Sequence, residues 1–252
     1  MNTAGESARR AAWILFLALP ALQLPYPFLS GRAQESFTVL IVVLAAAFSV
    51  AHLAATEGAR AAAVLTALCV VICGGAEALS IATGWPFGYY NYGPLLGPPL
   101  LGVPVLVPVA WLMAAYPAYR VGQAVAPRYP VLAGALALTA WDLFLDPRMV
   151  ASGAWTWDSP AFYAGIPLRN YFGWLITSLA LLAAFQRLAA PARPARGSFA
   201  LLPVALYAWL WLGYTFLNVA WWRDPLVAAV GGVGMGLFAL PAMARAWAAR
   251  RA

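Results

Sequence analysis

The sequence predicts an all-α polytopic membrane helix bundle with about eight transmembrane helices. Three observations lead to this prediction: the composition, a series of long apolar segments, and a one-sided distribution of arginine. Of the 252 residues, 64% are hydrophobic and only 9% are charged, whereas a soluble domain has about a quarter of charged residues. We therefore expect a single integral membrane domain spanning residues 1–252.

The apolar segments give the number of helices. About 20 mainly apolar residues are needed to cross the hydrocarbon core of a bilayer. Eight segments meet this requirement: 11–29, 36–55, 61–82, 99–120, 130–146, 169–188, 198–221 and 225–247. A count of seven would require two of them to merge. The Gly/Pro-rich stretch before residue 99 ends one helix and precedes another.

The arginines predict the orientation of the bundle, because loops rich in Lys and Arg stay in the cytoplasm. With eight helices and a cytoplasmic N-terminus, one side holds eleven arginines: Arg9, Arg10, Arg60, Arg120, Arg128, Arg187, Arg193, Arg196, Arg245, Arg250 and Arg251. The other side holds four: Arg32, Arg148, Arg169 and Arg223. Both termini are therefore predicted to be cytoplasmic, in a multi-pass protein of the cell membrane.

The composition also excludes several classes of protein. The chain has no lysine, and a retinal pigment needs a lysine amine for its Schiff base. The net charge of +7 is scattered over short loops, so we expect no nucleic-acid partner. Cys69 and Cys73 lie one helical turn apart in an apolar segment and are expected to be buried thiols. No metal or cofactor is expected.

Three carboxyl groups lie in or at the end of apolar runs. They belong to Glu77, Asp142 and Asp146. A charged group at bilayer depth is costly, and its default interpretation is functional. In the predicted orientation all three fall at the non-cytoplasmic end of the bundle, where we expect the catalytic residues.

Asp142 and Asp146 are four residues apart and share one face of a helix. When two carboxyl groups lie this near each other, the charge of one opposes ionisation of the other. One of the pair is therefore expected to hold a proton at neutral pH and to serve as a general acid. Glu77 would be a proton donor or the group that positions water. In the alternative interpretation, Asp146 only ends the helix before Pro147 and pairs with Arg148, while Asp142 bonds a neighbouring helix.

Aromatic residues are dense in the two loops that follow these carboxyl groups. The loops contain prolines and glycines that impose defined turns, which favours the wall of a pocket over an interfacial aromatic belt. Aromatic faces also stabilise cations. Arg169 has a structural alternative as the partner of Asp158 or of a buried carboxylate. The candidate substrate-binding residues are Trp85, Phe87, Tyr89, Tyr90, Asn91, Tyr92, Trp155, Trp157, Tyr163, Arg169 and Asn170.

A weak internal repeat is visible in the same region. An acidic residue, an aromatic loop and Gly102-Val103-Pro104 precede one apolar segment. Asp146, its aromatic loop and Gly165-Ile166-Pro167 precede another. Duplicated helical hairpins are common in membrane proteins.

Five motifs stand out in the central region of the chain: EALSIATGWPFGYYNY (77–92), LGPPLLGVP (96–104), AWDLFLDPRM (140–149), GAWTW (153–157) and GIPLRNYFGW (165–174). Together they resemble the membrane carotenoid biosynthesis family, which includes the CruF-type carotenoid hydratases and the archaeal bisanhydrobacterioruberin hydratase. The resemblance covers roughly residues 70–180.

The resemblance implies a hydro-lyase of the carotenoid 1,2-hydratase type, which adds water to the terminal double bond of an acyclic ψ-end. It implies Glu77, Asp142 and Asp146 as the acid/base set, with an acyclic or monocyclic carotenoid, water and membrane lipid as partners. Association with other enzymes of carotenoid synthesis stays open. Two alternatives remain: an end-group cyclase, because cyclisation starts from the same cation, and a non-catalytic membrane carrier or transporter.

Overall fold

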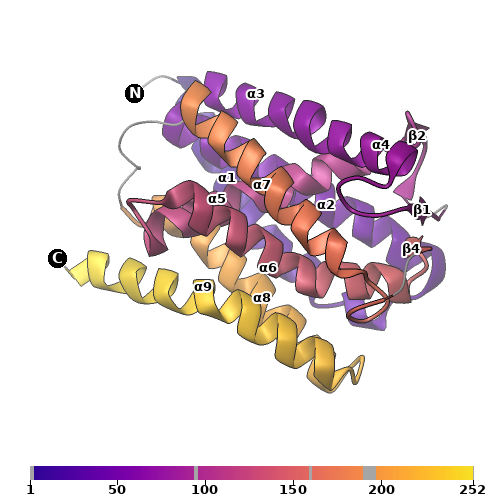
Figure 1. The fold of residues 1–252 in the computed structure, drawn as a ribbon. Helices are drawn as coiled ribbons and strands as arrows, with labels where there is room; N and C mark the ends of the chain where they lie inside the picture. The colour runs from indigo at the N-terminus through magenta and orange to yellow at the C-terminus, as the bar shows by residue number, and fades with distance from the viewer. Residues whose placement is uncertain (1–2, 94–95, 159–160, 190–196, 252) are drawn as a thin grey trace.

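The computed structural model describes residues 3–93, 96–158, 161–189 and 197–251. The helices form one elongated bundle, and the two chain termini lie at the end opposite the short strands (Figure 1). Arg193 and Arg196, which contributed to the predicted orientation, lie outside the described residues. The orientation itself stays a prediction.

The described residues form eight helical rods, so the prediction of an all-α bundle with about eight helices is confirmed. One rod consists of α3 (Ala59–Leu68), a π-helical segment η2 (Cys69–Cys73) and α4 (Gly74–Thr83). The cysteines of η2 are free and buried. The other rods are α1 (Thr3–Gln23), α2 (Gly31–Glu57), α5 (Leu106–Val125), α6 (Pro130–Ala151), α7 (Leu168–Leu188), α8 (Leu202–Ala220) and α9 (Pro225–Arg251). Short 3-10 turns, η1 (Tyr26–Phe28) and η4 (Phe199–Leu201), lie beside them.

Six of these rods are long and apolar enough to cross a membrane, and α5 and α6 are the two that fall short of that criterion. These two helices pack against each other; α5 also packs against α2, α8 and α9, and α6 against α7 and α9. Because protein rather than lipid surrounds α5 and α6, both can contain polar side chains that a lipid-facing helix would exclude. The acidic residues of α6 are an example.

Several predicted helix boundaries are wrong. The first apolar segment was predicted over residues 11–29, but α1 covers Thr3–Gln23. The fourth apolar segment was predicted to begin at residue 99, but α5 begins at Leu106. Residues before it form a hairpin of β2 (Pro99–Leu100) and β3 (Val103–Pro104) instead. The fifth segment was predicted to end at residue 146, but α6 continues through Pro147 to Ala151.

The helices continue past their prolines because neighbouring side chains replace the lost backbone bond. Pro147 has no N–H, so the carbonyl group of Leu143 loses its helical donor. The hydroxyl of Tyr163 donates to this carbonyl oxygen at 3.1 Å. In α5, Pro117 likewise leaves the carbonyl of Met113 without its helical partner, and Ser49 Oγ donates to it at 3.4 Å. Such replacement is what permits proline within membrane helices.

The two aromatic loops meet in an antiparallel pair of strands. They are β1 (Tyr90–Tyr92) and β4 (Trp155–Trp157). Tyr90 lies opposite Trp157 and Tyr92 opposite Trp155, so the pairing is symmetric about its central residues.

The weak internal repeat has a matching backbone. Leu101 and Gly102 have φ values of 53° and 81°, and Ala164 and Gly165 have 48° and 87°. Two successive positive φ angles between paired residues are characteristic of a type I′ hairpin turn. The two members of the predicted repeat therefore share a local conformation, and each is followed by a proline and a long helix.

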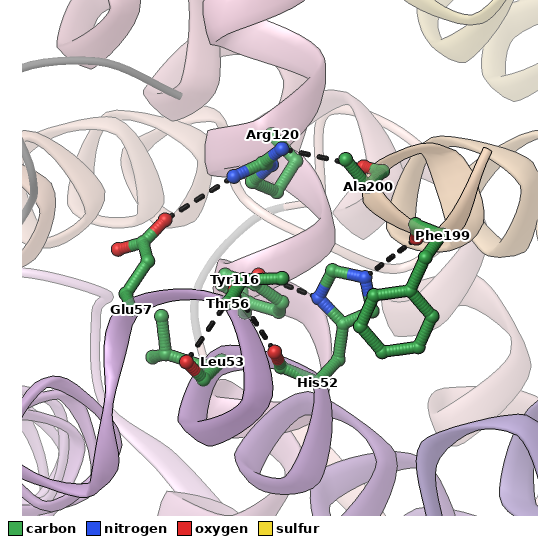
Figure 2. A network of polar contacts seen from close by, with 8 residues as sticks. All are labelled: His52, Leu53, Thr56, Glu57, Tyr116, Arg120, Phe199 and Ala200. Carbon is green, nitrogen blue, oxygen red and sulfur yellow. Dashed lines mark hydrogen bonds and ion pairs between the residues drawn. The ribbon is translucent and has the colours of Figure 1, made fainter. Parts of the chain in front are cut away.

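A polar network holds the opposite end of the bundle (Figure 2). The ring nitrogens of His52 pair with the Tyr116 hydroxyl and the Phe199 carbonyl, both at 2.8 Å. Nearby, Arg120 forms a buried ion pair with Glu57 at 3.2 Å. The network joins α2, α5 and η4, and leaves the end with the strands available for a cavity.

We expect Tyr163→Phe to destabilise the protein and Tyr171→Phe to have little effect. The first change leaves the buried Leu143 carbonyl without a donor, which costs about 1–3 kcal/mol. Tyr171 is the matched control, because its buried hydroxyl has no hydrogen-bond partner among the described residues. Thermal unfolding of the purified protein in detergent measures both. An equal loss of stability in the two variants would contradict this account of α6.

Candidate active site

Glu77 is a buried carboxylate surrounded by donors. It lies on α4 with 6% of its surface exposed. Its Oε2 accepts hydrogen bonds from the hydroxyls of Tyr90 and Tyr92, the latter at 3.0 Å, and its Oε1 accepts one from Trp111 Nε1 at 3.0 Å. A carboxylate can accept about four such bonds. One acceptor position, on Oε1, therefore remains for a ligand.

The two tyrosines stay protonated donors to Glu77. Burial, followed by the charge of Glu77, raises the pKa of Tyr90 well above its ordinary value. The same two causes raise the pKa of Tyr92. Strand geometry points both side chains to one face, because alternate residues of a strand share a face.

Asp142 and Asp146 are bridged by one amide group. Nδ2 of Asn170, in the first turn of α7, donates to Asp142 Oδ2 at 3.0 Å and to Asp146 Oδ2. The two carboxyl groups are 0% and 2% exposed. Oδ1 of Asp142 has no hydrogen-bond partner among the described residues. A buried oxygen without a partner costs less in a neutral carboxyl group than in an anion, so the geometry favours a proton shared within this pair.

The alternative pairing of Asp146 with Arg148 is wrong. Among the described residues, the structure has one ion pair, between Arg120 and Glu57. The guanidinium group of Arg148 instead lies over the ring of Trp222, 4.4 Å from its centre.

An apolar cavity of about 510 Å³ adjoins the carboxyl groups. Glu77, Asp146 and Asn170 line it, whereas Asp142 does not. Residues of α8 recur along it every three or four positions, which places them on one face of that helix. These residues are Leu206, Trp209, Leu210, Gly213, Tyr214, Phe216 and Leu217. From Leu206 to Leu217 the face extends about 16 Å at 1.5 Å per residue, so the cavity is elongated.

Stacked indole rings form another part of the cavity wall. Trp111 and Trp174 stack at 4.0 Å between ring centres, and Trp141 meets Trp174 edge-on at 6.2 Å. All three line the cavity. Their faces and edges present a polarisable surface beside Glu77 and Asp146.

The cavity reaches the outer surface of the bundle beside η1 and the end of α8. Leu24, Phe28, Phe216 and Trp221 line it and are 46–72% exposed. Because these exposed residues are apolar and belong to a bundle of membrane helices, the opening faces lipid. Here α1 and α8 meet at a hydrogen bond of 2.5 Å from Trp209 Nε1 to Gln23 Oε1.

The structure brings together some of the predicted substrate-binding residues and leaves others outside. Those that line the cavity are Phe87, Tyr90, Tyr92, Trp155, Trp157 and Asn170. Trp85, Tyr89, Asn91 and Arg169 are exposed and do not line it, and Tyr163 bonds Leu143 instead. Arg169 forms no ion pair within the described part of the chain, and Asp158 accepts from Asn91 at 3.2 Å.

Sequence reasoning missed several cavity residues. Trp111 and Trp174 lie equally far beyond Gly102 and Gly165 of the weak repeat, a signal that was available in the sequence. Trp141 precedes Asp142, and Arg148 was considered only as an ion-pair partner. The α8 face had no such signal, because its role depends on long-range packing. Within the described residues, no group of three His, Cys, Asp or Glu side chains is placed to hold a metal ion.

These features define a polytopic membrane protein whose buried carboxyl groups adjoin an apolar cavity that is open to lipid. The chain belongs to the carotenoid biosynthesis protein family, whose model matches residues 37–239. The family resemblance is thus confirmed, and it extends well beyond residues 70–180.

A bisanhydrobacterioruberin hydratase of Haloarcula japonica is 34% identical to the chain over 168 residues. The aligned region covers 62% of this chain and 57% of that relative, so the chain spans little more than half of the relative's length. No solved structure matches the chain.

We expect Gly173→Ala to disturb the first aromatic loop. A Cβ atom at Gly173 of α7 would lie 2.5 Å from Phe87 Cδ1 and 3.0 Å from the backbone of Pro86. The loop would have to move, although Ser80 and Trp157 also hold it through hydrogen bonds to Gly88 and Phe87. Thermal stability should therefore fall.

The matched control for this change is Gly75→Ala, because an added Cβ atom there meets nothing within 4 Å. Alanine also favours a helix over glycine by about 1 kcal/mol, so Gly75→Ala should be neutral or stabilising. The unfolding temperature in detergent reports on both variants. An unchanged unfolding temperature of Gly173→Ala would refute the role of this contact.

Proposed function

We propose that this protein adds water to the terminal double bond of an acyclic, ψ-end carotenoid and so forms a tertiary alcohol. One observation carries the proposal: Asp146, one of two carboxyl groups bridged by a single amide, lines an elongated apolar cavity that opens to lipid. Membership of the carotenoid biosynthesis family supports the substrate class. The name of the Haloarcula relative supports the reaction.

The apolar opening beside η1 and α8 suits a substrate that is insoluble in water. A long polyene would enter sideways from the bilayer and place one end along the α8 face. Ligand pockets commonly enclose about 300–1,000 Å³, and the cavity of about 510 Å³ is within that range. The elongated cavity favours a linear end group over a bulky ring.

Asp146 is the proposed proton donor, because it lines the cavity and Asp142 does not. Asp142 would position Asp146 through their shared Asn170 amide and keep the pair partly protonated, since two adjacent carboxylates oppose double ionisation. Proton transfer from a positioned acid contributes about 10²–10⁴-fold to a rate.

The chemistry needs a cation to be stabilised and a water to be positioned. Asp146 delivers its proton to one alkene carbon, the π bond breaks, and the neighbouring carbon becomes a tertiary cation. The indole faces of Trp111 and Trp174 and the charge of Glu77 would stabilise this cation. Water held by the remaining acceptor position of Glu77 Oε1 would then form the new C–O bond.

The protons balance within the carboxyl set. The attacking water loses a proton to Glu77. Transfer of a proton from Glu77 back to Asp146 then resets the site. Two carboxyl groups in unlike environments are a common solution for acid/base chemistry in one cavity. The reaction described here uses no redox step.

Two other functions start from related features. An end-group cyclase would form the same cation, and its cation would be captured by a second double bond instead of water. A carrier would need a polar path across the membrane, whereas Glu77, Asp146 and Asn170 gather at one cavity. The experiment that follows separates all three.

Expression in a lycopene-producing bacterium should yield carotenoids heavier by one water for each modified end group. Mass spectrometry of extracted pigments measures this gain. A product of unchanged mass but altered absorption would indicate cyclisation. If lycopene stayed unmodified although the protein was folded and inserted in the membrane, both enzymatic functions would be rejected and only the carrier function would remain.

Substitution of Asp146, the proposed proton donor, should nearly stop the reaction. We expect Asp146→Asn to lower the hydration rate by about 10²–10⁴-fold, the usual contribution of a general acid. Asp142→Asn should cause a smaller loss, and Glu77→Gln should slow water capture. The control is Asp158→Asn, since Asp158 is exposed and does not line the cavity. Pigment analysis with matched protein levels measures each rate. Full activity of Asp146→Asn would overturn the assignment of the donor.

A further inference from the structure

The proposed reaction consumes water, yet the apolar cavity offers water no easy approach. Its lipid-facing opening is lined by exposed apolar side chains such as Phe28 and Phe216. A bound polyene would fill this opening. Water therefore has to reach Glu77 and Asp146 by a different route.

A second pocket, of about 290 Å³, lies beside the apolar cavity at the start of α2 and the end of α6. We call it the polar pocket, because Gln34, Glu35, Thr38, Arg148 and Ser152 line it. Such groups can hydrogen-bond water, and water needs two to four polar partners to occupy a site.

The polar pocket reaches the surface of the molecule at the end where the strands lie. Its lining includes Gly31, Ala151 and Ser152, which are exposed. Gly31 begins α2 and Ala151 ends α6. The ends of membrane helices lie near the membrane surface, so this pocket opens toward water and not toward the centre of the bilayer.

The two spaces meet at shared residues. Five residues line both the apolar cavity and the polar pocket: Tyr26, Thr38, Leu96, Arg148 and Met149. Asp146 is one turn or less from Arg148 and Met149 on α6, so the junction adjoins the proposed proton donor. A molecule that passes this junction arrives at the carboxyl groups directly.

Arg148 supplies an unpaired donor at the junction. Its Nε is buried and has no hydrogen-bond partner among the described residues. Its guanidinium group lies over the ring of Trp222, 4.4 Å from the ring centre. Opposite it on α2, the Thr38 hydroxyl is engaged with Tyr26 and with the Gln34 carbonyl, each at 2.9 Å. The junction thus combines a fixed cation with a fixed hydroxyl, which suits a small polar molecule.

We propose that the polar pocket is the water inlet of the site, and that Thr38, Arg148 and Met149 form its inner gate. Water enters from the membrane surface, while the polyene enters from lipid through the opening beside η1 and α8. This inference rests on the proposed function. It adds that the two substrates arrive by separate routes, so that a bound polyene does not exclude water.

Cysteine labelling tests the inlet without relying on catalysis. Thr38→Cys lies at the gate, and Val42→Cys lies one turn further along α2, on the apolar cavity alone. With carotenoid bound, a cationic methanethiosulfonate should modify Thr38→Cys about tenfold faster than Val42→Cys. The reason is that only a water-exposed thiol forms the reactive thiolate. The native thiols of Cys69 and Cys73 are 1% and 0% exposed and give a low background. Met149→Cys is the second gate variant if Thr38→Cys does not fold.

Equal labelling of the gate and cavity positions, or no labelling of either gate variant, would overturn the inlet. Activity then gives a second readout. Labelled Thr38→Cys in proteoliposomes should lose most of its hydration activity while it retains its bound pigment. The same reagent should leave the wild-type protein active. Full activity of the labelled variant would also reject the inlet.

The test separates this inference from the proposed function. If the wild-type protein forms no tertiary alcohol, the proposed function fails, whatever the labelling shows. If the wild-type protein hydrates its substrate and the labelled gate has no effect, the inlet alone fails.

Discussion

Every polar atom inside this bundle has to find its partner within the protein, because lipid supplies none. The Leu143 carbonyl, freed by Pro147, is satisfied by Tyr163. Glu77 is satisfied by three donors, and one amide of Asn170 serves two aspartates. The exceptions are informative. Among the described residues, eight buried side-chain atoms have no hydrogen-bond partner, and four of them, Asp142 Oδ1 and the nitrogens of Trp141, Arg148 and Trp155, belong to residues in or beside the cavity. Unsatisfied groups cost stability, so these four favour a site that receives polar ligands during function.

Packing of the central helices makes this arrangement possible. Because α5 and α6 are enclosed by other helices, Asp142 and Asp146 contact protein and not lipid. The outer helices provide the contact with the bilayer, and α8 and η1 leave an apolar opening between them and the site. In the proposed reaction, the polar step and the apolar substrate would thereby be accommodated in one fold, each on the side that its solvation requires.

The sequence allowed the helix number, the carboxyl cluster and the two aromatic loops to be predicted, because each depends on local hydropathy or on a short motif. The orientation of individual loop residues was not recognised. Tyr90 and Tyr92 face the cavity while Asn91 between them is exposed, as the alternation of a strand requires, but β1 is only three residues long. The end of α6 was misjudged because a proline normally stops a helix, and the compensating Tyr163 is distant in the chain. The lining from α1, α2 and α8 follows from tertiary packing, for which the sequence contained no local signal.

The symmetry of the site explains how one scaffold supplies two unlike carboxyl groups. Glu77 precedes Tyr90 by as many residues as Asp142 precedes Trp155, and β1 pairs with β4 about a local two-fold relation. Trp111 and Trp174 occupy corresponding positions and stack on each other.

The two halves differ in the donors that surround their carboxyl groups. Glu77 receives two tyrosine hydroxyls, whereas tryptophans replace them on the other side and Asp142 and Asp146 share a single amide. Three donors stabilise an anion that can bind water, while a crowded pair with one donor retains a proton. In the proposed reaction, this asymmetry between two similar halves would provide both the acid and the base.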